Sequence, residues 1–346
     1  MTASSPAADM FHLTGCCARV AGRLLPLVSA LVLAACTGQQ SALAPAGPGA
    51  RDAAVLWWAM LAGSVVIFAL VLTLLLYAVL RRPEDRRPVA VERMIVGGGI
   101  ALPVVALSIL LPFGLNMGAS TYAELPPDAL TVRIEGRQWW WKVEYLGDGS
   151  APRFTTANEI HLPVGEPVEL LLSSADVIHS FWVPRLAGKQ DLIPGRVNRL
   201  VVEAEEPGVF RGQCAEFCGV AHSQMALYVV AVPPEEFQAW AGRQHGPAEL
   251  PRTEAQARGA AAFASNGCAL CHAVRGQGAW GEVGPDLTHV GSRRTIGAAL
   301  VANTVENVAT WIARNHEMKP GNEMPSFTHL DAETRLAIAT YLESLR

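Results

Sequence analysis

The 346-residue chain lacks any excess of positive charge. It carries 27 Lys and Arg residues against 31 Asp and Glu residues, which gives a formal net charge of −4 at pH 7. No run of basic residues is interleaved with aromatic ones. This absence excludes nucleic-acid binding, whose usual footprint is a basic patch. The sequence also contains no internal repeat, which excludes a repeat array.

Two long segments lack both charge and histidine. They cover residues 53–80 and 94–120, whereas a helix needs only about 20 apolar residues to cross a bilayer. Neither segment shows the polar stripe of a soluble helix. The sequence therefore predicts a multidomain membrane protein with a two-helix transmembrane hairpin within 51–120. Prolines and glycines in the second segment predict that this helix is bent.

The arginines near these segments lie mostly between them. The outer flanks hold only Arg51, whereas the loop holds Arg81, Arg82, Arg86, Arg87 and Arg93. Because positive loops stay in the cytoplasm, we expect both ends of the chain on the periplasmic face of a bacterial inner membrane.

Residues 1–36 have the layout of a secretory signal peptide. Two arginines precede an apolar run at 24–35, which is too short to span. Leu33-Ala-Ala-Cys36 resembles the cleavage box of bacterial lipoproteins, in which the cysteine receives a diacylglycerol. An ordinary signal peptide with a chance cysteine is the alternative, so lipidation of Cys36 stays open.

The remainder divides into a β-rich part and a helical part. Residues 128–235 contain strand-like runs separated by Pro/Gly turn signals, which predicts an all-β sandwich or barrel. Residues 242–252 have the composition of a linker. Residues 253–346 open on a capping box, Thr253-Glu-Ala-Gln256, and continue with helical periodicity.

A haem attachment motif lies at the start of the helical part. In Cys268-Ala-Leu-Cys271-His272 the two thiols can add to the vinyl groups of one haem c, and His272 can ligate the iron. Met324 is the predicted sixth ligand, with Met318 as its competitor. Alternatives are a thioredoxin-like CxxC or a zinc knot that also uses His289.

Residues 253–346 as a whole resemble class I cytochromes c. Gly259 and Phe263 match the first-helix contact of that family, and Tyr341 matches its partner on the last helix. Gly284-Pro-Asp-Leu287 matches the loop that packs on the proximal histidine. The resemblance implies an all-α domain that carries electrons.

A second cluster of metal ligands lies at the end of the β-rich part. Cys214, Cys218, His222 and Met225 fall within twelve residues, and His179 adds a second imidazole. Soft sulfur with imidazole selects copper, and two thiolates favour a dinuclear centre. Zinc and a Cys214–Cys218 disulfide are the alternatives.

Residues 50–235 resemble the second subunit of cytochrome c oxidase. The resemblance rests on the two spans, Gln138-Trp-Trp-Trp141, Asp176-Val-Ile-His-Ser-Phe-Trp-Val-Pro184, Asp191-Leu-Ile-Pro-Gly-Arg196 and the copper loop. It implies a Greek-key cupredoxin domain holding the dinuclear CuA centre through His179, Cys214, the Glu216 carbonyl, Cys218, His222 and Met225.

The same resemblance assigns three further roles. The Glu216 carboxylate would bind magnesium at the interface with subunit I, and Trp139 would accept electrons on the way to copper. Glu92 would stand at the mouth of a proton channel of subunit I. Trp140 departs from the tyrosine common at its position.

The expected function is electron delivery within a haem-copper oxidase. Electrons would pass from an external donor such as a soluble cytochrome c to haem c, to copper and then to subunit I, with subunit III as a further partner. Because the spans contain no histidine, oxygen chemistry must reside on subunit I. The alternatives are a nitric oxide reductase subunit and a copper-carrying lipoprotein. A quinol oxidase subunit is disfavoured because the copper ligands are present.

Overall fold

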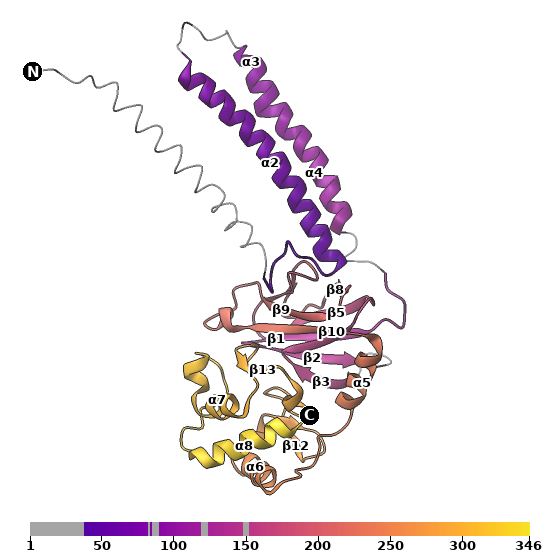
Figure 1. The fold of residues 1–346 in the computed structure, drawn as a ribbon, viewed down its shortest axis with the longest axis vertical. Helices are drawn as coiled ribbons and strands as arrows, with labels where there is room; N and C mark the ends of the chain where they lie inside the picture. Colours follow the sequence, from indigo (N-terminus) through magenta and orange to yellow (C-terminus); the bar gives the residue numbers. More distant parts are fainter. Residues whose placement is uncertain (1–37, 82–83, 85–89, 119–123, 148–151) are drawn as a thin grey trace, which may run out of the picture.

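The computed structural model describes residues 38–81, 84, 90–118, 124–147 and 152–346. The predicted signal peptide with Cys36, and most of the arginine-rich loop, lie outside these residues. Figure 1 shows three parts along the long axis of the molecule: a helix hairpin, a β-sandwich and a helical domain.

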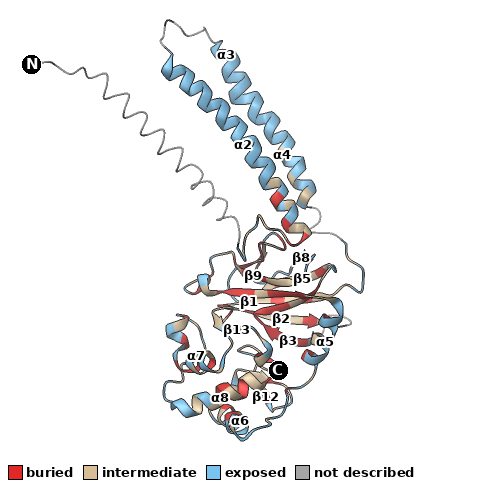
Figure 2. Cartoon of the chain, in the orientation of Figure 1, coloured by how far each residue is buried: buried red, intermediate tan, exposed pale blue. Residues whose placement is uncertain are grey.

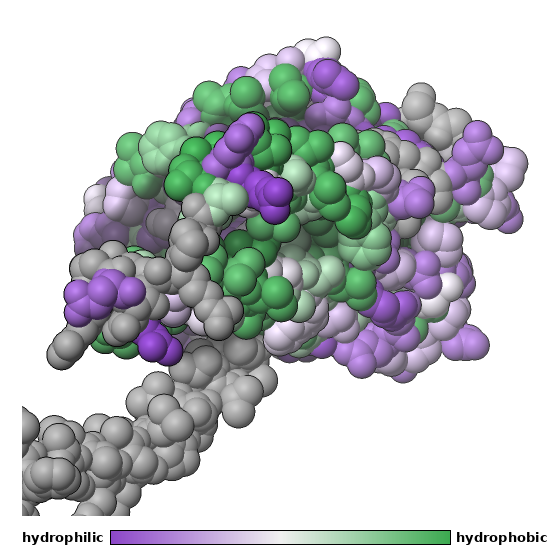
Figure 3. All heavy atoms as spheres, turned by 90° about the horizontal axis from the view of Figure 1, so that it is seen from above, coloured by the Kyte–Doolittle hydropathy of each residue, from purple (hydrophilic) through white to green (hydrophobic). Residues whose placement is uncertain are grey.

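Two apolar helices form the hairpin. Helix α2 (Pro48–Leu80) is followed by α3 (Val91–Met94), the π-helical η2 (Ile95–Ala101) and α4 (Leu102–Gly118). Both stretches are long and apolar enough to cross a membrane. Most residues of both helices are exposed (Figure 2). Hydrophobic residues form much of the surface seen from above (Figure 3). The predicted hairpin is confirmed, and Gly97–Gly99 lie in the π-helical stretch.

Ten strands form a sandwich of two five-stranded sheets. The first has the order β3 (Pro152–Ala157), β2 (Trp140–Leu146), β1 (Thr131–Arg137), β5 (Val168–Ser174) and β8 (Asn198–Val202). The second has the order β4 (Glu159–Pro163), β10 (Ala226–Val232), β9 (Gly208–Cys214), β6 (His179–Trp182) and β7 (Gln190–Leu192). Burial alternates along β1 and β2, so one face of that sheet packs on the core. The predicted all-β domain is confirmed.

The predicted linker at 242–252 begins too early. Helix α5 (Pro234–His245) continues through Gly242 and packs on the sandwich, where Trp240 stacks on His161 with ring centroids 4.1 Å apart. The following segment is also held: Ala248 is buried, and its amide donates to the Arg275 carbonyl at 2.9 Å. Burial of α5 on the sandwich outweighs the weak helix propensity of its glycine.

The C-terminal domain consists of helices around a core of its own. Helix α6 (Glu254–Ser265) starts with the predicted capping box. The turn η5 (Cys268–Leu270) follows it, and α7 (Val305–Met318) and α8 (Ala332–Ser344) complete the domain. Short β-bridged segments at β11 (Ala273–Val274), β12 (Ala279–Trp280), β13 (Thr295–Ile296) and β14 (Val301–Ala302), with the turn η6 (Val290–Ser292), shape the loops.

Helices α6 and α8 meet at a glycine. A Cβ atom on Gly259 would lie 2.0 Å from the Ala337 carbonyl oxygen, so only glycine permits this approach. Phe263 and Tyr341 extend the contact with ring centroids 5.8 Å apart. The contact expected from the resemblance to class I cytochromes c is therefore present.

We predict that Gly259→Ala lowers the free energy of unfolding of the C-terminal domain by about 2 kcal/mol or more, because the methyl group overpacks the α6–α8 contact. Denaturant unfolding followed by haem absorbance measures this change. Gly242→Ala is the matched control, since it adds a methyl to α5 with no heavy atom within 4 Å. That variant should be neutral or slightly more stable. Equal effects of the two substitutions would contradict the account.

Candidate copper and haem sites

The second sheet and the loop after β9 bring the predicted copper ligands together. His179 opens β6 and Cys214 closes β9, and these two strands are paired. Cys218 follows in the loop, His222 begins the turn η4 (His222–Gln224), and Met225 ends it. His179 and Cys214, 35 positions apart in sequence, thus meet on two neighbouring interior strands of the sheet.

Each sulfur or nitrogen atom of this cluster lies within 4 Å of at least one other. Cys214 Sγ is 3.7 Å from Cys218 Sγ and 3.8 Å from His179 Nδ1. Cys218 Sγ is 3.6 Å from His222 Nδ1 and 3.9 Å from Met225 Sδ. The Glu216 carbonyl oxygen lies 3.2 Å from Cys214 Sγ. All six predicted donor groups are therefore assembled in one place.

The contact between the two sulfur atoms shifts their pKa values in opposite directions. The hydrogen bond with Cys218, supported by His179, lowers the pKa of the Cys214 thiol to about 3, while the same contact raises the pKa of Cys218. Burial acts to lower the pKa of His179, but hydrogen bonds to Cys214 and Asp176 outweigh it and raise that pKa. A metal would replace these protons.

The donor set fits copper better than the alternatives. Cys214 and Cys218 are free and buried, so the predicted alternative of a disulfide is not the state of this structure. Two thiols and two imidazoles would complete a tetrahedral zinc site, but the thioether of Met225 and the Glu216 carbonyl lie in the same cluster. Six donors including a thioether suit two copper ions.

Neighbouring residues fix the first imidazole. Asp176 Oδ1 lies 2.8 Å from His179 Nε2, which turns Nδ1 toward Cys214. A Cβ atom on Gly136 would lie 2.7 Å from the His179 ring, so the absence of a side chain there makes room for it. His179 is fully buried.

We predict that Asp176→Asn weakens copper binding about 10- to 100-fold, because an amide is a poorer acceptor from the imidazole than a carboxylate is. Copper titration with a competing chelator measures the affinity. Asp191→Asn, a carboxyl change on the neighbouring strand β7, should leave the affinity unchanged. The same loss in both variants would show that Asp176 has no specific role.

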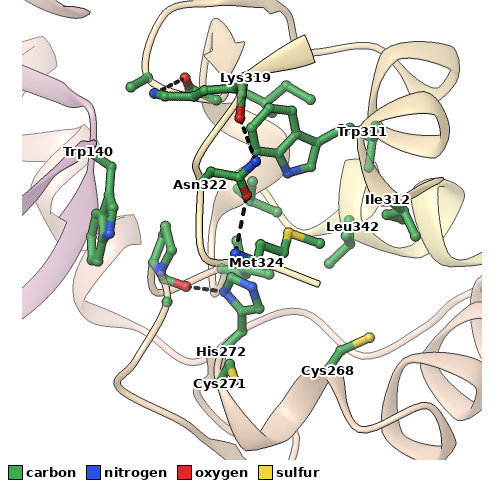
Figure 4. Close-up of a pocket in the computed structure, with 18 of the residues that line it drawn as sticks. Trp140, Cys268, Cys271, His272, Trp311, Ile312, Lys319, Asn322, Met324 and Leu342 are labelled. Carbon is green, nitrogen blue, oxygen red and sulfur yellow. Dashed lines mark hydrogen bonds between the residues drawn. The ribbon is translucent and has the colours of Figure 1, made fainter. Parts of the chain in front are cut away.

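The haem motif borders a cavity of about 210 Å³, which is lined by the C-terminal domain and by Gln138, Trp139, Trp140 and Asn158 of the sandwich. Cys268, Cys271, His272 and Met324 all line it, and the side chains of His272 and Met324 both project into it (Figure 4). His272 Nδ1 donates to the Pro285 carbonyl at 2.8 Å, which leaves Nε2 for a metal. Burial lowers the pKa of His272, so its ring is neutral and able to ligate iron.

Glycines make space around the proximal histidine. A Cβ atom on Gly284 would lie 2.5 Å from His272 Cε1, and one on Gly281 would lie 2.4 Å from the Cys271 carbonyl carbon. Two thiols, a fixed imidazole and an apolar cavity are the features that a covalent haem requires. The residues present therefore fit haem c.

The alternatives for this motif fit less well. The one group of metal-ligand type found among the described residues is His179, Cys214 and Cys218, so Cys268, Cys271 and His289 do not form a zinc knot there. Met318 does not line the cavity, and its carbonyl accepts from Gln224 Nε2 at 3.0 Å. The position of Met324 favours it as the sixth ligand.

We predict that Met324→Ala abolishes the low-spin spectrum of haem c but leaves copper in place, because the thioether completes the iron coordination. Absorption spectroscopy and metal analysis measure both. Met318→Ala is the control and should keep the low-spin spectrum. The reverse result, with loss in Met318→Ala alone, would assign the ligand to Met318.

Trp139 joins the copper loop to the loop that carries Met324. Its Nε1 donates to the Cys218 carbonyl at 2.9 Å. A Cβ atom on Gly219 would lie 2.9 Å from the indole, and one on Gly321 would lie 3.0 Å from it. Trp140 and Trp139 also line the haem cavity. Trp139 thus lies between the two loops, and Trp140 lies beside the haem cavity (Figure 4).

Two further predicted roles fall on the side chains of Glu92 and Glu216, which do not belong to either set of ligands. Glu92 lies in α3 at the far end of the hairpin and is exposed. The Glu216 side chain is half-buried beside the copper loop. Their assigned roles in proton uptake and magnesium binding both require subunit I and stay predictions.

Lys319, which follows α7, was not among the residues predicted from the sequence. Its side chain is 2% exposed, and its Nζ reaches three carbonyl groups, two of them in the β-sandwich. A lone lysine beside a helix end carries no pattern that would have marked it.

Comparison with known proteins agrees with this geometry. The profile of "Cytochrome C oxidase subunit II, periplasmic domain" matches residues 143–232, and the profile of "Cytochrome c" matches residues 256–346. These matches imply copper for the first domain and haem for the second. Fold and sites together define a membrane-anchored oxidoreductase component with two redox domains.

A relative that matches nearly the whole chain shows the family to which it belongs. Cytochrome c oxidase subunit 2 of Alkalihalophilus pseudofirmus is 34% identical over 348 residues, which cover 95% of this chain and 98% of the relative. The subunit 2 of Bacillus subtilis is 31% identical over 63% of each chain. The periplasmic domain of subunit II of Bradyrhizobium japonicum is 32% identical over 35% of this chain and 96% of that chain, with a TM-score of 0.32. The chain belongs to the cytochrome c oxidase subunit II family, with a fused C-terminal cytochrome c domain.

Proposed function

We propose that this chain is the subunit of a haem-copper oxidase that receives electrons from an external donor and delivers them to the oxygen-reducing site of subunit I. When bound, haem c would carry one electron. The CuA pair would also carry one electron, shared between its two copper nuclei. The oxidase would lie in the bacterial inner membrane with both redox domains on the periplasmic face, joined by subunit III.

The observation that carries the proposal is the paired sulfur cluster. Cys214 Sγ and Cys218 Sγ lie 3.7 Å apart, each with an imidazole nitrogen within 4 Å. One thiolate would suffice for a single copper ion. Two thiolates that can both bridge support a dinuclear centre, whose bond lengths change little when it gains one electron.

The protein's own residues would hold the two groups, and Trp139 occupies the space between the loops that carry them. Cys268, Cys271, His272 and Met324 would hold the haem; His179, Cys214, Cys218, His222, Met225 and the Glu216 carbonyl would hold the copper. Trp139 is 8% exposed and fills the gap between the loops. Its indole keeps the two sites at a fixed separation in a medium of low polarity.

Two finer roles depend on subunit I. The Glu216 side chain would bind magnesium, since its backbone carbonyl already borders the copper cluster. Glu92 would feed a proton channel from the opposite membrane face. Its place at the end of the apolar helix hairpin supports this role.

We predict that Cys218→Ser in the purified oxidase abolishes oxygen consumption while the donor still reduces haem c. The serine oxygen is a hard ligand that cannot bridge two copper ions as a thiolate does. An oxygen electrode and stopped-flow absorbance measure the two steps. Ser223→Ala, in the same loop and exposed, is the control with full activity.

Three results would contradict the proposal. Undiminished oxygen consumption in Cys218→Ser would exclude the copper centre from the electron path. Consumption of nitric oxide with none of oxygen by the unaltered complex would make it a nitric oxide reductase. Copper that exchanges freely with chelators, in a chain without haem, would indicate a copper-carrying lipoprotein.

A further inference from the structure

The C-terminal domain covers the tryptophan through which its own electrons would pass. Gly321 packs against the Trp139 ring edge in a left-handed backbone conformation with φ of 85°. Trp139 retains only 8% exposure. A separate donor protein therefore has no open surface on Trp139 to contact.

Backbone contacts fix the two domains to each other in addition to this packing. The Ala226 amide of β10 donates to the Ala298 carbonyl at 3.2 Å, and the Arg294 amide donates to Glu159 Oε2 at 2.9 Å. The side chain of Gln224 donates to the Met318 carbonyl at 3.0 Å. These bonds join the copper loop and its sheet to the segments that flank the haem cavity.

Lys319 lies at the centre of this contact. Its Nζ donates to the carbonyl oxygens of Trp139 at 2.6 Å, Gln224 at 2.9 Å and Gly297 at 2.9 Å. The first two belong to the copper-binding domain and the third to the haem domain. An ammonium group has three N–H donors, so the three carbonyls match it one for one.

Burial of an ammonium group costs free energy unless hydrogen-bond partners compensate for the lost water. Burial lowers the pKa of Lys319 to about 7, and the nearby Cys218 acts in the opposite direction. The three carbonyl oxygens accept hydrogen bonds from the ammonium group. The chain has only three lysines, at positions 142, 189 and 319. Arginine, which is far commoner here, has a planar fork that does not match three converging acceptors.

We propose that Lys319 is a positioning residue that locks the haem domain onto Trp139, so that haem and copper exchange electrons in one fixed arrangement within the chain. An external donor then reaches the chain at the haem domain and not at Trp139. This inference rests on the proposed electron path from haem to copper.

The test uses the purified oxidase and follows a single electron. A photoexcited ruthenium complex injects the electron into haem c, and transient absorbance then records haem oxidation and copper reduction. Fixed docking predicts that the wild-type rate is the same from about 0.01 to 1 M salt, although the Debye length falls tenfold over this range. The rate should also be unaffected by added glycerol.

Lys319→Met removes the ammonium and leaves three buried carbonyls unpaired. The haem-to-copper rate should fall at least about tenfold and become sensitive to salt and viscosity, because the docked fraction falls. Haem absorbance and the copper EPR signal should be unchanged, which separates lost positioning from lost folding. Lys189→Met, at an exposed position, is the matched control and should behave as wild type.

The outcomes distinguish the two claims. A Lys319→Met variant with the wild-type rate and no salt dependence would overturn the positioning role and leave the electron path intact. If the variant does not assemble, the wild-type rate decides, because a rate that falls with viscosity means mobile domains and overturns the proposal. No haem-to-copper transfer in wild type would overturn the proposed function itself.

Discussion

The arrangement of both redox sites depends on the packing of Trp139 between two glycines. On one side its indole donates to the Cys218 carbonyl and touches Gly219, and on the other it touches Gly321. A side chain at either glycine would push the tryptophan away from one loop. The copper cluster and the haem cavity are therefore held at a set distance by one buried ring, and the hydrogen bonds of Lys319 close the contact around it.

Much of the fold follows from local patterns in the sequence. The charge-free runs predicted the helices of the hairpin, and the strand-like runs at 168–172 and 227–232 lie in β5 and β10. The spacing from Cys214 to Met225 predicted a metal cluster, and the structure gathers those donors within a few ångströms. Such features are predictable because a hydrophobic period or a short ligand spacing constrains its own segment.

The relation between the domains could not be predicted in the same way. The segment proposed as a linker begins inside α5, whose apolar side chains pack on the sandwich. Lys319 and Gly321 act through residues about 180 positions earlier in the chain. Neither residue lies in a sequence pattern that identifies its partner. The role of a single buried lysine becomes visible only when the groups that accept its hydrogen bonds are located in space.

The measurement that tests the central claim most directly is low-temperature EPR of the oxidised full-length protein, with copper, zinc and haem quantified in the same sample. We expect two copper ions and one haem per chain, with a hyperfine pattern from one electron shared between two copper nuclei. Zinc in place of copper, or a disulfide between Cys214 and Cys218 with no copper signal, would contradict it. The chain would then be a tethered cytochrome c whose β-sandwich serves only as a docking domain.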